Sequence, residues 1–320
     1  MTDGPAKVTD LSQNRAPEAE VGPDSELAED RGRGSGRGSK LIVGCGYLGL
    51  RVARRWIAAG HAVAGLVRSS AAAESLARES IRPTVADVTQ PSTLLSLPAA
   101  DTLLYAVGYD PASGASRSAV YVDGLRAVLD AISPPVRRVI LISSTGVYAE
   151  QGGGWVDESS PAQPSRESGR ALLAAEEILA AHRLGALGII LRLAGIYGPG
   201  RLPRRSELAA GQPLPIATGQ QVNLIHVDDA AAAVLAAEAY ARPPRTYIIS
   251  DGRPVERREY FAEMARQLGL PRPSFREPLP GEITGRGGGD KRVSNARMLG
   301  ELHLKLAYPT YREGLAAAVR

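Results

Sequence analysis

From Lys40 onward, short runs of β-branched and other apolar residues alternate with longer stretches rich in Ala, Leu, Glu and Arg. The short runs are apolar on both faces and predict buried strands, at residues 41–43, 62–67, 84–85, 102–106, 138–143, 188–193 and 246–250. The longer stretches predict helices, at residues 48–59, 71–79, 115–131, 166–184 and 228–241. Such strands separated by helices indicate a parallel sheet with both faces covered. We therefore expect an α/β protein with a Rossmann-type, doubly wound sheet.

The same pattern predicts three parts of the chain. Residues 1–39 carry few large apolar side chains and end in RGRGSGRGS, which is typical of a disordered tail. Residues 40–195, completed by about 222–250, are expected to form the Rossmann domain. After Tyr197 the pattern loosens, with Pro, Gly and Arg clusters at 198–205 and 271–289. Residues 196–221 and 251–320 are therefore expected to form a smaller C-terminal lobe that binds substrate.

Composition and charge exclude several classes of protein. The 320 residues include 38 Lys and Arg against 34 Asp and Glu, and this small excess, spread along the chain, does not indicate nucleic acid binding. The Arg-Gly repeat is compatible with RNA contact, and equally with a flexible leader. One cysteine, Cys45, excludes an internal disulfide, and four His without Cys partners do not indicate a metal site. With no apolar run of membrane-spanning length and no signal-peptide core, we expect a cytoplasmic protein.

Lysine is scarce, and its distribution limits the chemistry. Only four of the basic residues are lysines, namely Lys7, Lys40, Lys291 and Lys305. Residues 41–290 contain none. A Schiff base, a lysine general base or a phosphate-binding P-loop lysine is therefore excluded from that stretch.

The sequence KLIVGCGYLGLRVARRW places a glycine-rich loop between the first expected strand and the first expected helix. In such a loop, Gly44 permits a tight turn, Gly46 lets the backbone approach a pyrophosphate, and Gly49 lets the helix pack closely. The helix N-terminus adds N–H groups for the phosphates. We expect a dinucleotide cofactor to bind at Gly44, Cys45, Gly46, Tyr47, Leu48 and Gly49. Cys45 is interpreted as a small packing residue, with a redox role as the alternative.

The end of the second expected strand bears on which dinucleotide binds. NAD enzymes place an acidic residue on the adenosine ribose here, whereas this chain has Arg68 followed by two serines. A guanidinium suits a 2′-phosphate, so NADP is favoured over NAD, although a solvated arginine would look the same. Asp87, after the third expected strand, is placed either to meet the adenine edge or to form a turn.

Four further segments occur in a recognisable order: ISSTGVYAE, LRLAGIYGPGR, NLIHVDDAAAAV and KRVSNARMLGEL. Together with the glycine loop, they make residues 40–320 resemble the extended short-chain dehydrogenase/reductases, the NAD-dependent epimerase/dehydratase superfamily. The G-x-G-x-x-G spacing looks like its atypical branch. The resemblance implies an oxidoreductase or epimerase/dehydratase-like protein acting on a nucleotide sugar or another small carbonyl or alcohol. It also suggests a homodimer.

The resemblance implies roles for several side chains. The family pattern Ser-x-x-x-Tyr puts the substrate-holding hydroxyl on Ser144, with Tyr148 beyond it; the alternative is that Ser144 caps a turn. The family's Tyr-x-x-x-Lys proton relay is absent. Its two positions fall on Ser168 and Leu172, or on Arg166 and Arg170 in a shifted register, because there is no Tyr between residues 149 and 196.

Other side chains are candidates for contacting substrate. Tyr197 is either a lid or packing residue or a substitute proton donor. His226 next to Asp228 is either an acid/base pair or part of a helix start capped by Asp228. Arg192 and Asn223 are placed to contact substrate. No G-x-S-x-G motif is present, which disfavours a serine hydrolase. The alternative to an enzyme is a non-catalytic NADP-binding redox sensor or scaffold.

Overall fold

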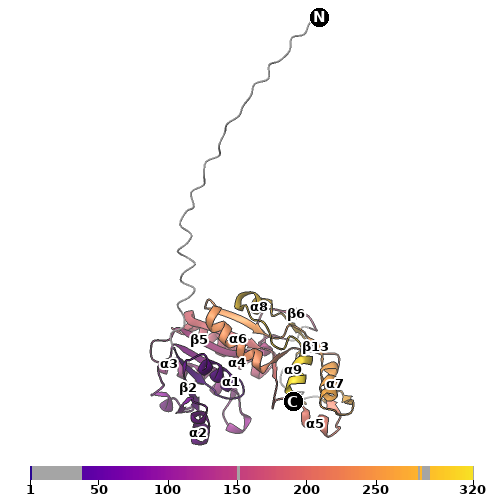
Figure 1. Cartoon of the computed structure of the whole chain (residues 1–320), viewed down its shortest axis with the longest axis horizontal. Coiled ribbons are helices and arrows are strands. Elements are labelled where there is room, and N and C mark those ends of the chain that lie inside the picture. Colours follow the sequence, from indigo (N-terminus) through magenta and orange to yellow (C-terminus); the bar gives the residue numbers. More distant parts are fainter. Residues whose placement is uncertain (2–37, 150–151, 280–281, 283–288, 320) are drawn as a thin grey trace. The chain divides into compact units, whose positions relative to one another are not determined.

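The computed structural model describes residue 1 and residues 38–149, 152–279, 282 and 289–319. Its centre is a parallel sheet of seven strands in the order β12-β7-β5-β4-β1-β2-β3 (Figure 1). The strands are β1 (Ser39–Val43), β2 (Ala62–Val67), β3 (Arg82–Val85), β4 (Thr102–Tyr105), β5 (Arg138–Ser144), β7 (Gly188–Leu193) and β12 (Arg245–Ile249). From β1 the chain builds outward first on one side and then on the other. The expected doubly wound α/β fold is confirmed.

Helices cover both faces of this sheet because successive strand residues point to opposite faces. Ile42 of β1 packs in a core with α1 (Gly49–Ala58), α6 (Val227–Tyr240) and α8 (Ala296–Leu302). Its neighbours Leu41 and Val43 pack in a second core with α3 (Gly124–Ala131) and α4 (Glu167–Ala181). The short α2 (Ser70–Arg78) joins β2 to β3. Figure 1 shows α1 and α6 on one side of the sheet. No helix in the described ranges is long and apolar enough to cross a membrane.

The expected elements differ from the structure mainly at their ends. β1 begins at Ser39, the last residue of the expected tail, because the Ser39 backbone N–H donates to Asp101 Oδ2 at 2.8 Å. Residues 2–37 lie outside the described residues, so the disordered tail stays a prediction. The helix expected at 115–131 contains a π-helical turn, Ala119–Asp123, before α3.

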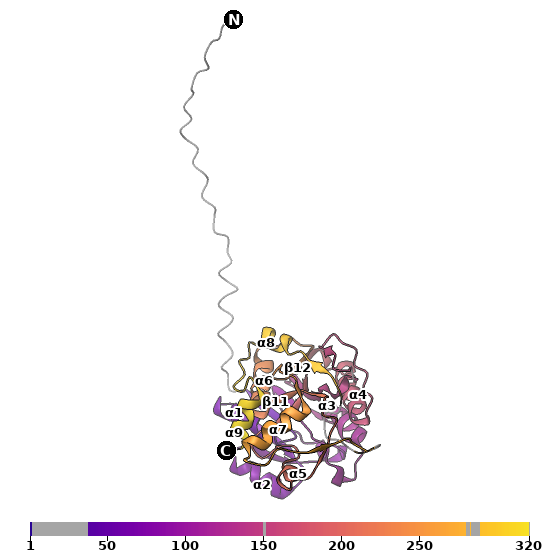
Figure 2. The same ribbon diagram turned by 90° about the vertical axis from the view of Figure 1, so that its right-hand side faces the viewer.

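The C-terminal part of the chain has its own core. It gathers α5 (Arg205–Ala209), α7 (Arg257–Gln267) and α9 (Tyr311–Ala318), which lie near one another in Figure 2. The described residues also form four two-stranded ladders, and each of them includes at least one strand from the C-terminal part. The pairs are β8 (Gly195–Tyr197) with β11 (Leu224–His226), β10 (Gln221–Val222) with β13 (Val255–Glu256), β9 (Leu214–Pro215) with β14 (Phe275–Arg276), and β6 (Trp155–Val156) with β15 (Arg292–Val293). Part of the segment expected to be a loop at 271–289, namely 280–281 and 283–288, lies outside the described residues.

Candidate functional site

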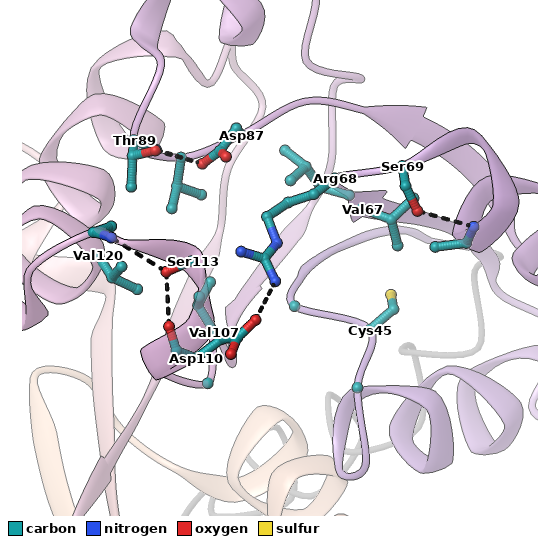
Figure 3. A pocket seen from close by; sticks show the side chains of 17 residues that line it. Cys45, Val67, Arg68, Ser69, Asp87, Thr89, Val107, Asp110, Ser113 and Val120 are labelled. Carbon is teal, nitrogen blue, oxygen red and sulfur yellow. Dashed lines mark hydrogen bonds and ion pairs between the residues drawn. The ribbon is translucent and has the colours of Figure 1, made fainter.

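A cavity of about 430 Å³ opens at the carboxyl ends of β1, β2, β3 and β4 (Figure 3). This is where the order of the strands reverses, the position at which open α/β sheets bind ligands. The loops after these four strands, with the start of α2 and a residue of the π-helical turn, supply the lining: Gly44, Cys45, Gly46, Leu66, Val67, Arg68, Ser69, Ala72, Asp87, Val88, Thr89, Val107, Gly108, Asp110, Ser113, Ala115 and Val120.

The glycine loop forms one wall of the cavity, and each glycine has a distinct physical reason. Gly44 has a φ of +100°, and a Cβ there would lie 2.6 Å from the Ala106 carbonyl. A Cβ on Gly49 would lie 2.3 Å from the carbonyl oxygen of Gly44, so only glycine lets α1 begin so close to the loop. A Cβ on Gly46 would meet no atom of the described residues within 4 Å. Within the described part of the chain, Gly46 therefore borders open space, and no side chain caps the first turn of α1. This arrangement fits a pyrophosphate.

Three other loop residues expected to bind the cofactor differ in position. Cys45 lines the cavity, but burial raises the pKa of its thiol to about 12, so the thiol is protonated at neutral pH. This favours the interpretation of Cys45 as a packing residue. Leu48 is buried in the core beneath α1 and does not line the cavity. The Tyr47 hydroxyl donates to the Pro199 carbonyl at 3.1 Å, which turns this side chain away from the cavity.

Charged side chains stand at the rim of the cavity. Arg68 Nη2 lies 3.1 Å from Asp110 Oδ2, so a pair between the end of β2 and the segment after β4 spans the rim (Figure 3). Asp87 also lines the cavity, and its Oδ1 accepts hydrogen bonds from the backbone N–H and the hydroxyl of Thr89. Asp87 therefore forms the expected turn while also lining the cavity, and its contact with the adenine edge stays a prediction. Sequence reasoning missed Asp110, whose only local signal is an Asp-Pro pair typical of a turn.

Ser144 lies at the carboxyl end of β5 and does not line the cavity. Its neighbours Ser143 and Thr145 are buried, whereas Ser144 is partly exposed. Ser144 Oγ accepts a hydrogen bond from the Gly146 N–H at 3.0 Å and so caps a 3-10 turn, Thr145–Val147. The turn-capping alternative is thus realised. The hydroxyl hydrogen of Ser144 nevertheless remains available to donate.

Arg192 and Tyr148 were expected to contact substrate, but the structure engages both inside the protein. Arg192 donates from Nε and Nη2 to the Glu176 carboxylate at 2.6–3.2 Å, and from Nη1 to the Tyr148 hydroxyl at 2.6 Å. The Ser143 hydroxyl donates to the same carboxylate at 2.6 Å. Burial alone would lower the pKa of Arg192, but the hydrogen bonds to Glu176 outweigh it and raise the pKa. The network leaves neither predicted residue facing open space.

Helix α4 covers this end of the sheet. A Cβ on Gly169 would lie 2.3 Å from the Gly146 carbonyl oxygen, so α4 rests directly on the turn after β5. Leu172, one relay position, packs against the apolar cluster around Val147. Arg170, from the other register, is exposed and donates to the Ser165 carbonyl at 2.8 Å. Neither register supplies the family's proton relay.

Lysine does reach the neighbourhood of β5, from outside the lysine-free stretch. Lys291 is buried, and its Nζ donates to the Tyr148 carbonyl at 3.2 Å. Asn223 supports the same segment, since its Nδ2 donates to the Lys291 carbonyl and its Oδ1 accepts from the Val293 N–H, both at 2.9 Å. Asn223, an expected substrate contact, is thus engaged in hydrogen bonds that stabilise β15.

The other candidates, Tyr197 at the end of β8 and His226 at the end of β11, are also buried. His226 caps α6 itself, because its Nδ1 accepts from the Asp228 N–H at 3.3 Å; the expectation that Asp228 is the cap is wrong. Burial lowers the pKa of His226, which favours a neutral ring. Tyr197 is 1% exposed, and its hydroxyl has no hydrogen-bond partner among the described residues. A packing role suits this position better than that of a lid.

Comparisons with known proteins agree with this geometry. Residues 41–250 match the model of the NAD-dependent epimerase/dehydratase family. Protein YeeZ of Escherichia coli K12 is 31% identical over 84% of this chain and 95% of its own. A solved putative NAD-dependent epimerase/dehydratase from Methylobacillus flagellatus is 35% identical, with a TM-score of 0.69 over 89% of this chain and 98% of its own.

A more distant structure shares the fold. The dTDP-glucose 4,6-dehydratase DesIV from Streptomyces venezuelae, solved as a double mutant with NAD bound, is 21% identical. Its TM-score is 0.73 over 88% of this chain and 95% of its own. The family match spans the glycine loop, the cavity and the strand ends described above. The chain therefore belongs to the NAD-dependent epimerase/dehydratase family.

Proposed function

We propose that this chain binds NADP(H) in the cavity and acts as an oxidoreductase or epimerase-like enzyme on a nucleotide sugar or another small carbonyl or alcohol. The observation that carries the proposal is the open space in front of Gly46, where the backbone and the uncapped start of α1 would hold the pyrophosphate. When bound, the cofactor supplies the hydride chemistry. A nucleotide sugar is favoured because DesIV, which shares the fold, is a dTDP-glucose dehydratase.

The preference for NADP over NAD rests on Arg68. Its guanidinium lines the cavity at the end of β2, beside Ser69, where NAD enzymes carry an acidic residue. A guanidinium bonds a phosphate through short, charge-assisted hydrogen bonds. NAD-bound DesIV supports a dinucleotide in this fold but does not separate NADP from NAD.

Ser144 is the candidate for holding the reacting oxygen of the substrate. Its oxygen accepts from the Gly146 N–H, and its own hydrogen can still be donated to a substrate oxygen. Without the Tyr-Lys relay, the proton moves through Ser144 or water. The division into a Rossmann domain and a substrate lobe at 196–221 and 251–320 remains part of the proposal.

Titration of the purified protein with NADPH and with NADH tests cofactor choice, with nicotinamide fluorescence as the readout. Arg68→Ala should weaken NADPH by about 1.5–3 kcal/mol, the size of a lost charge-assisted hydrogen bond, and should leave NADH nearly unchanged. Arg78→Ala is the matched control, because Arg78 is exposed, pairs with Glu74 and does not line the cavity. Equal weakening of both nucleotides by Arg68→Ala would contradict a role in reading the 2′-phosphate.

Absorbance at the reduced nicotinamide band, followed with nucleotide sugars, ketones and aldehydes, tests catalysis. We expect Ser144→Ala to lower kcat while the affinity for NADPH stays the same. Tight NADPH binding with no turnover of any substrate would instead support a redox sensor or scaffold. A homodimer and a cytoplasmic location are further proposals. Light scattering coupled to size-exclusion chromatography tests the dimer.

A further inference from the structure

The Arg68–Asp110 pair at the rim of the cavity raises a question about cofactor choice. Both side chains line the cavity, and both remain about half exposed, 54% for Arg68 and 46% for Asp110. In Figure 3 the guanidinium extends across the cavity toward the Asp110 carboxylate. The group that was expected to bind a 2′-phosphate is therefore already paired with an anion. The carboxylate belongs to the segment after β4 and not to the end of β2 itself.

Asp110 is held in place independently of Arg68. Its Oδ1 accepts a hydrogen bond from the Ala112 N–H at 3.0 Å, which caps the 3-10 turn Pro111–Ser113. The Ser113 hydroxyl donates to the Asp110 carbonyl at 2.7 Å. These bonds fix the backbone that carries the carboxylate, while Arg68 reaches it on a long, flexible side chain. The hydrogen bond from Arg68 and the hydrogen bond from the Ala112 N–H both hold the pKa of Asp110 below its usual range. The carboxyl group is therefore ionised at neutral pH.

The two charges have opposite consequences for the two cofactors. A 2′-phosphate approaching Arg68 must replace the Asp110 carboxylate as its partner and then lie close to that carboxylate. A 2′-hydroxyl brings no charge and can donate to a carboxylate. An exposed ion pair of this kind contributes little free energy, so Arg68 can exchange partners at small cost.

We propose that Asp110 is a specificity-determining residue of the cofactor cavity. Its carboxylate competes with the 2′-phosphate for Arg68 and so reduces the ratio of the affinity for NADP to the affinity for NAD. The inference rests on the proposed function, because it requires that the cavity bind a nicotinamide dinucleotide. It adds a second position to cofactor selection, 42 residues from Arg68 in the sequence.

Asp110→Asn tests the inference because the amide oxygen can keep the cap to Ala112 while the charge is removed. We expect its Kd for NADPH to fall by about three- to tenfold, since an anion is removed from beside the phosphate site. The Kd for NADH should stay the same or rise. Asp130→Asn is the matched control: it removes the same charge from an exposed residue that pairs with His182 and does not line the cavity.

A double-mutant cycle with Arg68→Ala completes the experiment. The gain in NADPH affinity from Asp110→Asn should shrink when Arg68 is absent, because there is then no cation to release. The inference is overturned if Asp110→Asn leaves the Kd for NADPH unchanged, or alters NADPH and NADH equally, in a protein with unchanged thermal stability. If the wild type binds neither nucleotide, the proposed function itself fails and the inference with it. If the wild type prefers NADH, only the choice of NADP fails, and Asp110→Asn should still improve NADPH binding.

Discussion

The carboxyl ends of the strands form one edge of the sheet, yet the two halves of that edge differ. On the cavity side, at the ends of β1 to β4, Arg68 and Asp110 are half exposed and border open space. On the closed side, at the ends of β5, β7 and β12, Arg192 and Asp251 are buried, and so is Glu176 of α4, which pairs with Arg192. Position at a strand end therefore does not make a side chain available to a ligand. Its availability depends on which elements pack over it, and on the closed side α4 lies directly on the turn after β5.

Exposed and buried ion pairs differ in how much their loss destabilises the fold. An exposed pair such as Arg68–Asp110 contributes little to the stability of the fold, because water screens both charges. A buried pair such as Arg192–Glu176 becomes strongly destabilising when one partner is removed, because the remaining charge is left buried. We therefore expect substitutions on the cavity side to change binding, and substitutions on the closed side to change folding.

Glu176→Ala removes the buried carboxylate of the closed side and should strongly destabilise the protein. We expect a loss of about 3–5 kcal/mol in the free energy of unfolding, because Arg192 loses its carboxylate partner in the interior. Urea denaturation followed by circular dichroism measures it. Glu74→Ala, which removes a carboxylate from an exposed pair with Arg78, is the control and should cost less than about 0.5 kcal/mol.

Measuring both stability and cofactor affinity of Glu176→Ala tests whether the closed side affects folding alone. At a temperature where Glu176→Ala is still folded, its Kd for NADPH should lie within about twofold of the wild type, because Glu176 does not line the cavity. A folded variant that has lost NADPH binding would show that the closed side also shapes the cofactor site. A free energy of unfolding within about 1 kcal/mol of the wild type would show that the pair does not stabilise the fold.

The buried carboxyl of Asp251, on the closed side, should make the free energy of unfolding depend on pH. Burial raises the pKa of its carboxyl to about 7, so the folded state holds this proton more tightly than the unfolded state does. The free energy of unfolding should therefore fall as the pH rises from about 4 to about 7, and this contribution should be constant above that. Asp251→Asn removes it. The difference in stability between wild type and variant should change by about 3 kcal/mol over this range.

Thermal or urea unfolding at a series of pH values measures this difference. Asp251→Asn can retain the hydrogen bond that Oδ1 accepts from the Arg253 N–H at 2.9 Å, so the change is mainly one of charge. Parallel curves for Asp251→Asn and the wild type would show that this carboxyl titrates normally in the folded protein.

The sequence predicted the fold because its signals are local. The apolar run of each expected strand and the spacing of the three loop glycines can be read from residues close by in the chain, and the expected strands match the observed ones within two residues. The helix α7 also carried a local signal, with Tyr260, Phe261, Met264 and Ala265 on one buried face, but the surrounding Arg and Gly obscured it.

The roles of single side chains were less predictable because they depend on distant partners. Arg192 was expected to contact substrate, but its carboxylate partner, Glu176, lies 16 residues away on a helix whose packing the sequence does not specify. Asp110 meets Arg68 across 42 residues, so neither local sequence indicates the pair. His226 was expected to be either half of an acid/base pair or part of a helix start, and its burial and its cap to the Asp228 N–H favour the second alternative.

Gly46→Ala, on the cavity side, should weaken cofactor binding without lowering stability. Its φ lies outside the left-handed region, and the added Cβ would meet no protein atom within 4 Å, so the free energy of unfolding should not fall. The methyl group would instead occupy space that the pyrophosphate needs, and the Kd for NADPH should rise about tenfold, or 1.4 kcal/mol.

The matched control for Gly46→Ala is Gly300→Ala, in α8. Its Cβ also meets no atom within 4 Å, and the helix should gain about 0.5–1 kcal/mol of stability with no change in NADPH affinity. Isothermal titration and thermal unfolding of both variants provide the two measurements. If Gly46→Ala lowered stability but left the Kd unchanged, the open space in front of Gly46 would not be the cofactor site, and the cavity side would differ from the closed side only in its exposure to water.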